Sequence, residues 1–174
     1  MFAIQASIAE EIARALKASL TGEERAALER RPTTDLAAYD LYLRARAHHL
    51  RVGYTDLLRA EELYGQALAR DPGFALAHAQ LSHVHSLIHW LAYESDPARV
   101  DASLDHARAA LRLEPELADA HVAMGFQHYY GHRDYQAALA AFARARELRP
   151  NDPAAQAGIA FVQRRMARWD EHLT

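Results

Sequence analysis

The chain contains no cysteine, and Lys17 is the single lysine among its twenty basic residues. Without cysteine neither a disulfide framework nor a thiolate metal site can form; this fits a reducing compartment, and we expect a cytoplasmic protein. No apolar run approaches the roughly 20 residues that cross a bilayer, and Glu10 and Glu11 interrupt the apolar pattern at the N-terminus, so we expect no membrane association and no signal peptide. With a net charge of −3 and no basic run, nothing predicts binding to nucleic acid.

Familiar catalytic patterns are missing as well. The sequence has no glycine-rich phosphate loop, no Gly-x-Ser-x-Gly elbow and no cysteine nucleophile. Carboxylate pairs such as Glu61 and Glu62 are the kind that usually lie on solvated helix faces, and nothing in the pattern indicates a shifted pKa. We therefore expect neither enzymatic activity nor a cofactor. No segment alternates with period two over a useful length, so we expect essentially no β-strand.

What the chain does contain is an internal repeat. Three stretches align without a gap, each with a small residue first, an alanine seven residues later and a proline five beyond that: Ala60 to Pro72, Ser103 to Pro115, and Ala138 to Pro150. The small residues allow two helices to approach closely, and the proline ends the helix. Recurrence of this kind predicts a stack of helical hairpins. The stretches start 43 and then 35 residues apart. Compared with a helical-hairpin repeat of about 34 residues, the first interval is longer by roughly nine, and the natural location of this insertion is Trp90 to Asp96.

Helix boundaries are marked by capping residues. Thr33, Thr34 and Asp35 offer caps before a helix over 39–50, Gly53 breaks that helix, and Thr55 is a candidate cap for the next. The pairs 96–97 and 152–153 are both Asp-Pro, which predicts an Asp N-cap followed by proline in the first turn. A further first helix follows 152–153, and a partner helix would begin at Trp169, five residues before the last residue of the sequence.

The spacing resembles that of the tetratricopeptide repeat, whose first-helix motif is matched by Ala75 to Ser82 and by Ala118 to Gly125. The resemblance implies an all-α fold: a right-handed superhelical solenoid of helix-turn-helix hairpins, with about three complete repeats and half of a fourth. We expect the repeat domain to span 32–174, with repeats at about 36–73, 74–117 and 118–152 and a partial repeat at 153–174. Residues 1–31 would form an N-terminal amphipathic helix and a short connecting helix.

Residues 1–44 resemble a bacterial junction that joins a TolB-like segment to tetratricopeptide repeats in multidomain regulators. The matching residues are Phe2 to Gln5, Ile8 to Ala15, Leu20 and Thr21, Glu23 and Glu24, Arg31 to Thr34, and Ala38 to Arg44. Such regulators often have a cyclase, kinase or winged-helix DNA-binding domain toward the N-terminus. The resemblance implies that this chain is part of a larger regulatory protein.

Eleven histidines raise the question of a metal site. His85 and His89 are four residues apart and could share a helix face as zinc ligands do. However, His78 and His85 recur as His121 and His128 at a displacement of 43 residues, at positions where the family has aromatic side chains. There is also no His-Glu-x-x-His pattern. We interpret these histidines as packing residues and predict no metal site; a metal- or pH-responsive role is a weaker alternative.

The resemblance also implies a function: in tetratricopeptide stacks the first helices line a concave groove that binds a peptide or protein segment. Placing the family's inward positions on this sequence predicts a partner-binding groove formed by Tyr42, Arg46, His49, His83, Phe126, Tyr129, Tyr130, Phe161, Arg164 and Arg165, together with Ala79 and Val122. Aromatic side chains supply buried area and arginines supply planar forks for carboxylates. The family's clamp for a C-terminal carboxylate uses lysine and asparagine, which are absent at the matching places.

An alternative function is self-association as a homodimer. One apolar stripe runs along the predicted N-terminal helix. A stack that ends on a first helix leaves apolar side chains uncovered, and we expect Ile159, Phe161 and Val162 to be exposed for this reason. The predicted self-association residues are Ile4, Ile8, Ile12, Leu16, Ile159 and Phe161. Self-association requires a concentration-dependent size, whereas groove binding does not.

Overall fold

The structure, a computed structural model, describes residues 7, 8, 11, 32–91, 93, 94 and 96–170. Contacts between Cα atoms divide the chain into two compact units, Met1–Thr34 and Asp35–Thr174. In the first unit the described residues Ser7, Ile8 and Glu11 are helical. The second unit contains the predicted hairpins, and the candidate site lies within it.

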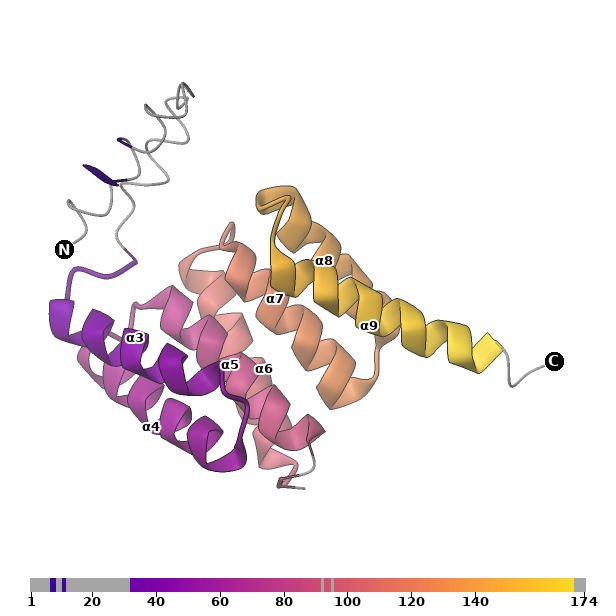
Figure 1. The fold of residues 1–174 in the computed structure, drawn as a ribbon, viewed down its shortest axis with the longest axis horizontal. Helices are drawn as coiled ribbons and strands as arrows, with labels where there is room; N and C mark the ends of the chain where they lie inside the picture. The colour runs from indigo at the N-terminus through magenta and orange to yellow at the C-terminus, as the bar shows by residue number, and fades with distance from the viewer. Residues whose placement is uncertain (1–6, 9–10, 12–31, 92, 95, 171–174) are drawn as a thin grey trace. The chain divides into compact units, whose positions relative to one another are not determined.

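The second unit is a row of antiparallel helices (Figure 1). Its elements are α3 (Leu36–His49), α4 (Tyr54–Arg70), α5 (Ala75–Trp90), α6 (Ala98–Leu113), α7 (Ala118–Phe126), a π-helix η1 (Gln127–His132), α8 (Tyr135–Leu148) and α9 (Pro153–Asp170). Helix α3 packs on α4, α5 on α6, and α7 on α8, while α5 also packs on α4 and α7. The described residues contain no strand, and the predicted all-helical repeat solenoid is confirmed.

The repeat signature residues form the core, as the alignment predicts. Ala60, Ala67, Ala107, Ala110, Ala138 and Ala145 are completely buried. Tyr64 and Phe142, the aromatic residues of two repeats, are also completely buried. Because Ala107 takes their place in the second repeat, α5, α6 and α7 meet there through an alanine cluster rather than through a ring. Small residues thus bring the helices together, and two rings fill the wider gaps.

Three of the boundary predictions need correction. Pro97, not Asp96, is the N-cap of α6, and the helix begins at Ala98 rather than at the proline. Gly53, not Thr55, is the N-cap of α4, and Thr55 lies inside its first turn. Helix α9 continues through Trp169 to Asp170, so a partner helix does not begin at Trp169. Nothing between 153 and 169 interrupts the helix, because the only glycine, Gly158, is held inside it against Phe142.

The other two predicted Asp caps are present. Asp35 Oδ1 accepts hydrogen bonds from the backbone N–H groups of Ala37 and Ala38 at 2.8 and 3.0 Å. Asp152 Oδ1 accepts from Ala155 N at 2.7 Å, and Pro153 is the first residue of α9. These bonds satisfy N–H groups that have no partner within the helix, so they determine where α3 and α9 begin.

The connection between α5 and α6 lies where the insertion was expected. Tyr54 Oη, from α4, donates to Glu94 Oε1 at 2.9 Å, and the rings of Tyr54 and Tyr93 are 5.0 Å apart. Arg99, at the start of α6, donates to both Glu94 oxygens, at 2.8 and 3.0 Å, and pairs with Glu61 of α4 at 2.7 Å. These contacts attach the connection to the first hairpin.

Candidate functional site

A cleft of about 700 Å³ lies along the first helices of the hairpins. Its walls come from α3 and the turn after it, from α5, α7 and η1, and from the turn before α9 with α9 itself. The lining residues are Tyr42, Arg46, His49, Leu50, Val52, Leu76, Ala79, Gln80, His83, Leu87, Asp119, Val122, Ala123, Phe126, Tyr130, Arg149, Asn151, Asp152, Pro153, Ala154 and Phe161. We call this the concave cleft.

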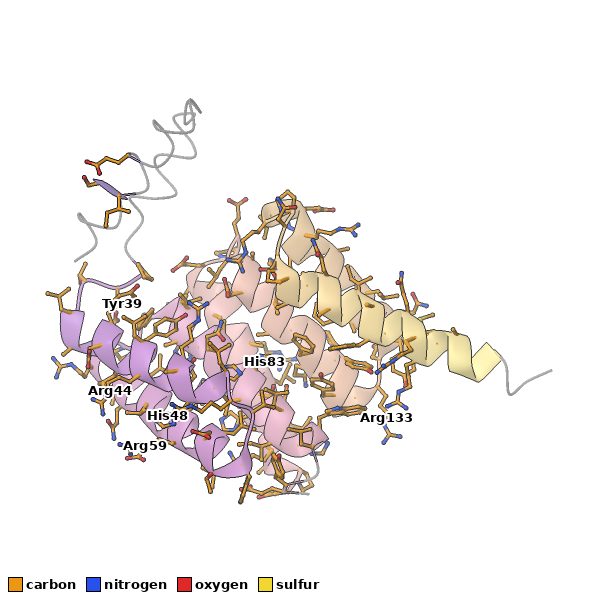
Figure 2. The ribbon with its side chains drawn as sticks, in the orientation of Figure 1. Tyr39, Arg44, His48, Arg59, His83 and Arg133 are labelled. Carbon is orange, nitrogen blue, oxygen red and sulfur yellow. The ribbon has the colours of Figure 1, made fainter. Side chains whose placement is uncertain are left out.

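Rings from three successive first helices are in contact along the concave cleft. The ring of His49 in α3 lies 5.0 Å from that of His83 in α5, which stacks at 4.5 Å on Phe126 in α7. Phe126 stacks in turn at 5.3 Å on Tyr130 in η1. Figure 2 shows His83 in the interior of the helical row, between the first and third hairpins. Such a row lines the cleft with apolar and weakly polar ring atoms.

The two histidines of this row are neutral at physiological pH. Burial, with a smaller contribution from the nearby Arg46, lowers the pKa of His49 to about 4. Burial also holds the pKa of His83 well below its usual value, with a smaller contribution from His49. Both causes disfavour a positive charge on either imidazole. The ring row therefore contributes no charge to the cleft near pH 7.

One end of the cleft is polar and internally paired. Arg149, in the turn before α9, forms ion pairs with Asp119 of α7 at 2.9 Å and with Asp152. Gln80 of α5 donates to Asp119 Oδ1 at 3.2 Å. Asp152 is itself buried and also caps α9. At this end two carboxylates share one guanidinium, which leaves one net negative charge, and the contacts link the second, third and fourth first helices.

Most of the predicted groove residues line the concave cleft. Seven of the ten do: Tyr42, Arg46, His49, His83, Phe126, Tyr130 and Phe161. Ala79 and Val122, which the same assignment placed inward, line it as well. The structure brings these residues together in one surface; their role in binding a partner stays a prediction.

Three predicted groove residues lie elsewhere, and their placement is corrected here. Tyr129 is buried against Trp90 and Tyr135, at ring distances of 5.5 and 6.0 Å. Tyr130, four residues after Phe126, lies on the same helix face as Phe126 and lines the cleft, so the adjacent Tyr129 points away from the cleft. Arg165 lies over the Trp90 ring at 5.4 Å rather than in the cleft. Arg164 is next to the cleft, over the ring of Phe161 at 5.8 Å, but does not line it.

Several lining residues were missed. Gln80 and Leu87 lie three residues before and four after His83, and Asp119 and Ala123 lie at the same kind of spacing from Val122 and Phe126. Helical periodicity around the predicted positions could have found these. The same periodicity reaches Leu50, four residues after Arg46. Val52, Arg149, Asn151 and Asp152 had no such signal, because they enter the cleft from loops.

The residues predicted for self-association are placed differently from the expectation. Val162 is completely buried, and Ile159 is half-buried against the core formed by α7, α8 and α9. Of the three apolar residues expected to be uncovered on α9, only Phe161 is exposed, at 38%. Ile159 and Val162 thus pack α9 into this core. Ile8 is half-exposed; Ile4, Ile12 and Leu16 lie outside the described residues.

The recurring histidines have a structural role that differs in part from the interpretation made from the sequence. Nε2 of His78 lies 3.2 Å from the carbonyl oxygen of Pro72, and Nε2 of His121 lies 2.9 Å from that of Pro115. In the fourth first helix Gln156 donates to the carbonyl of Pro150 at 3.5 Å. Each of these residues comes six after the repeat proline, so the position supplies a donor to the turn rather than only a flat ring.

A second group of histidines packs between α5 and α6. The rings of His85 and His106 stack at 5.7 Å, and the Nδ1 atoms of His78 and His106 are 2.8 Å apart. Burial is the main cause that lowers the pKa values of His85 and His106 to about 4. Within the described part of the chain, no group of three or more His, Cys, Asp or Glu residues is arranged to hold a metal ion.

Comparisons with known proteins agree with this architecture. The chain resembles the tetratricopeptide-repeat domain of Sgt2 from Aspergillus fumigatus, with a TM-score of 0.60 and 18% identity over 82% of this chain and 87% of that domain. This likeness shows a tetratricopeptide-repeat fold. The chain is also 37% identical over 82 residues to a putative adenylate cyclase 3 of Rhizobium meliloti (strain 1021); the match covers 47% of this chain and 14% of the cyclase. No family model matches the sequence.

No described helix is long and apolar enough to cross a membrane.

Proposed function

We propose that this chain is a non-catalytic protein-interaction module that binds a peptide or protein segment in the concave cleft, as part of a larger cytoplasmic regulatory protein of bacteria. The observation that supports it most is the continuous lining of the cleft by the first helices of four successive repeats. A concave, mostly apolar surface with a few fixed polar groups has the features of a recognition site. The likeness to part of a bacterial cyclase supports the regulatory context.

The proposal can be tested by selecting binders from a random peptide library displayed on phage, using the whole chain as bait. Synthetic copies of the selected peptides are then titrated by fluorescence polarisation against the chain and against Phe161→Ala. We expect Phe161→Ala to weaken binding at least fivefold, because Phe161 is an exposed aromatic at the edge of the cleft.

The matched control is Tyr93→Ala. Tyr93 is exposed to a similar degree as Phe161, at 42%, but lies in the α5–α6 connection and does not line the cleft. If Tyr93→Ala weakens binding as much as Phe161→Ala, or if no peptide is enriched, the cleft is not the recognition surface. Light scattering across a concentration series tests the self-association alternative. That alternative would be favoured only if the chain is a dimer and if Ile8→Glu or Phe161→Glu lowers its mass toward that of a monomer.

A further inference from the structure

The charges that line the concave cleft leave one side chain unmatched. Arg149 pairs with both Asp119 and Asp152. The fourth charged lining residue, Arg46 on α3, is exposed and forms no ion pair with any residue that the structure describes. His49 and His83 are neutral near pH 7 and add no further charge beside the guanidinium. The α3 side of the cleft is therefore a positive site that faces a weakly polar ring row.

Two apolar side chains are exposed beside Arg46, and one of these residues has an unusual backbone conformation. Leu50, one helical turn after Arg46, is 73% exposed, and Val52 is 41% exposed; both line the cleft. Val52 has a φ of 58°, in the left-handed region where a β-branched residue is strained and where glycine or asparagine is favoured. Neither the solvent exposure nor the backbone conformation of Val52 benefits the isolated fold.

We propose that the segment bound in the concave cleft is acidic: it places a side-chain carboxylate on Arg46 and an adjacent aliphatic or aromatic side chain against Leu50 and Val52. This inference rests on the proposed function and adds the chemistry of the partner. Charge complementarity carries it, because a basic segment would place a second positive charge beside the unpaired guanidinium. A buried apolar partner also explains why two exposed apolar residues line this side of the cleft.

The first test compares the peptides selected by the wild-type chain with those selected by Arg46→Glu. The control is Arg44→Glu, the same change on the same helix; Arg44 lies at the outer surface of α3 (Figure 2), pairs with Asp40 at 3.8 Å and does not line the cleft. We expect wild type and Arg44→Glu to enrich Asp or Glu next to an apolar residue, and Arg46→Glu to lose that preference. We expect acidic peptides to bind Arg46→Glu about tenfold more weakly than they bind the wild type. High salt should also weaken their binding to the wild type, but by a smaller factor.

The second test uses Val52→Asn. Asparagine tolerates the left-handed conformation, so we expect the melting temperature to rise while the affinity for the selected acidic peptides falls about threefold or more, because the apolar contact is lost. Such opposite changes exclude unfolding as the cause of weaker binding. Affinity that is unchanged in Val52→Asn would overturn the proposed docking of the partner on this side.

The two proposals fail in different ways. If peptides are selected that depend on Phe161 but are neutral or basic, or if Arg46→Glu binds acidic peptides as tightly as wild type does, the cleft binds segments and the acidic specificity is wrong. If no peptide is enriched by any variant, both proposals are wrong.

Discussion

Gly158 is the residue whose substitution measures most directly how α9 is held. A Cβ atom added at this position would lie 2.5 Å from Cε1 and 2.7 Å from Cε2 of Phe142, about 1 Å inside ordinary carbon contact. The ring has no free space on the other side, because a Cβ at Gly125 of α7 would lie 2.5 Å from the same Cε1 atom. Phe142 is thus enclosed between two glycines, one on each neighbouring helix.

The magnitude follows from two opposing effects. Replacing glycine by alanine inside a helix stabilises it by roughly 0.5–1 kcal/mol, whereas overpacking a closed core costs about 1–3 kcal/mol. We therefore expect Gly158→Ala to lower the free energy of unfolding by about 1–2 kcal/mol, or the melting temperature by about 2–8 °C for a chain of this size. Because α9 supplies Phe161 to the concave cleft, peptide affinity should fall as well.

Gly65 provides the matched control. It lies inside α4, and a Cβ built on it meets nothing within 4 Å, so Gly65→Ala should gain the helix propensity alone and raise the melting temperature. The double variant Gly158→Ala/Phe142→Leu, with a smaller side chain between the helices, should be more stable than the sum of the single changes predicts, by about 1 kcal/mol. Urea denaturation followed by circular dichroism measures the stability of the wild type and of the four variants Gly158→Ala, Phe142→Leu, Gly158→Ala/Phe142→Leu and Gly65→Ala. If Gly158→Ala is as stable as Gly65→Ala, the enclosure of Phe142 does not hold α9.

Two further predictions concern charge. The folded-state pKa values of His49 and His85, both about 4, lie below the unfolded value of about 6.5, so the unfolded chain binds more protons as the pH falls. The free energy of unfolding should fall below about pH 6.5 and level off near pH 4, with a loss at pH 5 of about 2 kcal/mol for each histidine. Urea titrations at several pH values check this. If the free energy of unfolding depends on pH as steeply in His49→Phe as in the wild type, the assignment to His49 is wrong. Asp152→Ala should destabilise the chain by about 1–2 kcal/mol, because it removes the α9 cap and one partner of Arg149. Asp152→Asn should retain the cap and therefore melt at a higher temperature than Asp152→Ala. Equal melting temperatures for the two variants would argue against the capping role.

The fold could be predicted from the sequence because its signals are local and recurrent. The alanines at positions 60, 67, 138 and 145 occur in register with their prolines, and each is completely buried in the structure. A repeat of this kind gives every hairpin the same packing instruction, so one correct alignment predicts several interfaces at once. The boundary errors at Thr55 and Trp169 arose where the sequence offered a plausible signal that the neighbouring glycine or the continuing helix overrode.

The candidate site could be predicted only in part. Phe126 and Tyr130 were assigned to the cleft correctly because both continue the helical line of the family's inward positions. Tyr129 is adjacent to Tyr130 and chemically identical, and both rings pack on Trp90, yet only Tyr130 lines the cleft, whereas Tyr129 contacts Tyr135. Which of two neighbouring tyrosines faces a cleft depends on the rotation of the helix about its axis, and that rotation is set by packing partners distant in sequence.

What the sequence by itself determined is the helical class, the repeat register and the buried alanines and rings, because these depend on periodicity and on capping within a few residues. The tertiary structure decided the electrostatics and the shape of the concave cleft. Arg46 and Arg149 both line it, but only the folded chain brings Asp119 of α7 to Arg149, beside its local partner Asp152, and leaves Arg46 without a carboxylate among the described residues. Charge pairing between distant segments depends on separations of a few ångströms, which the linear order of residues does not specify.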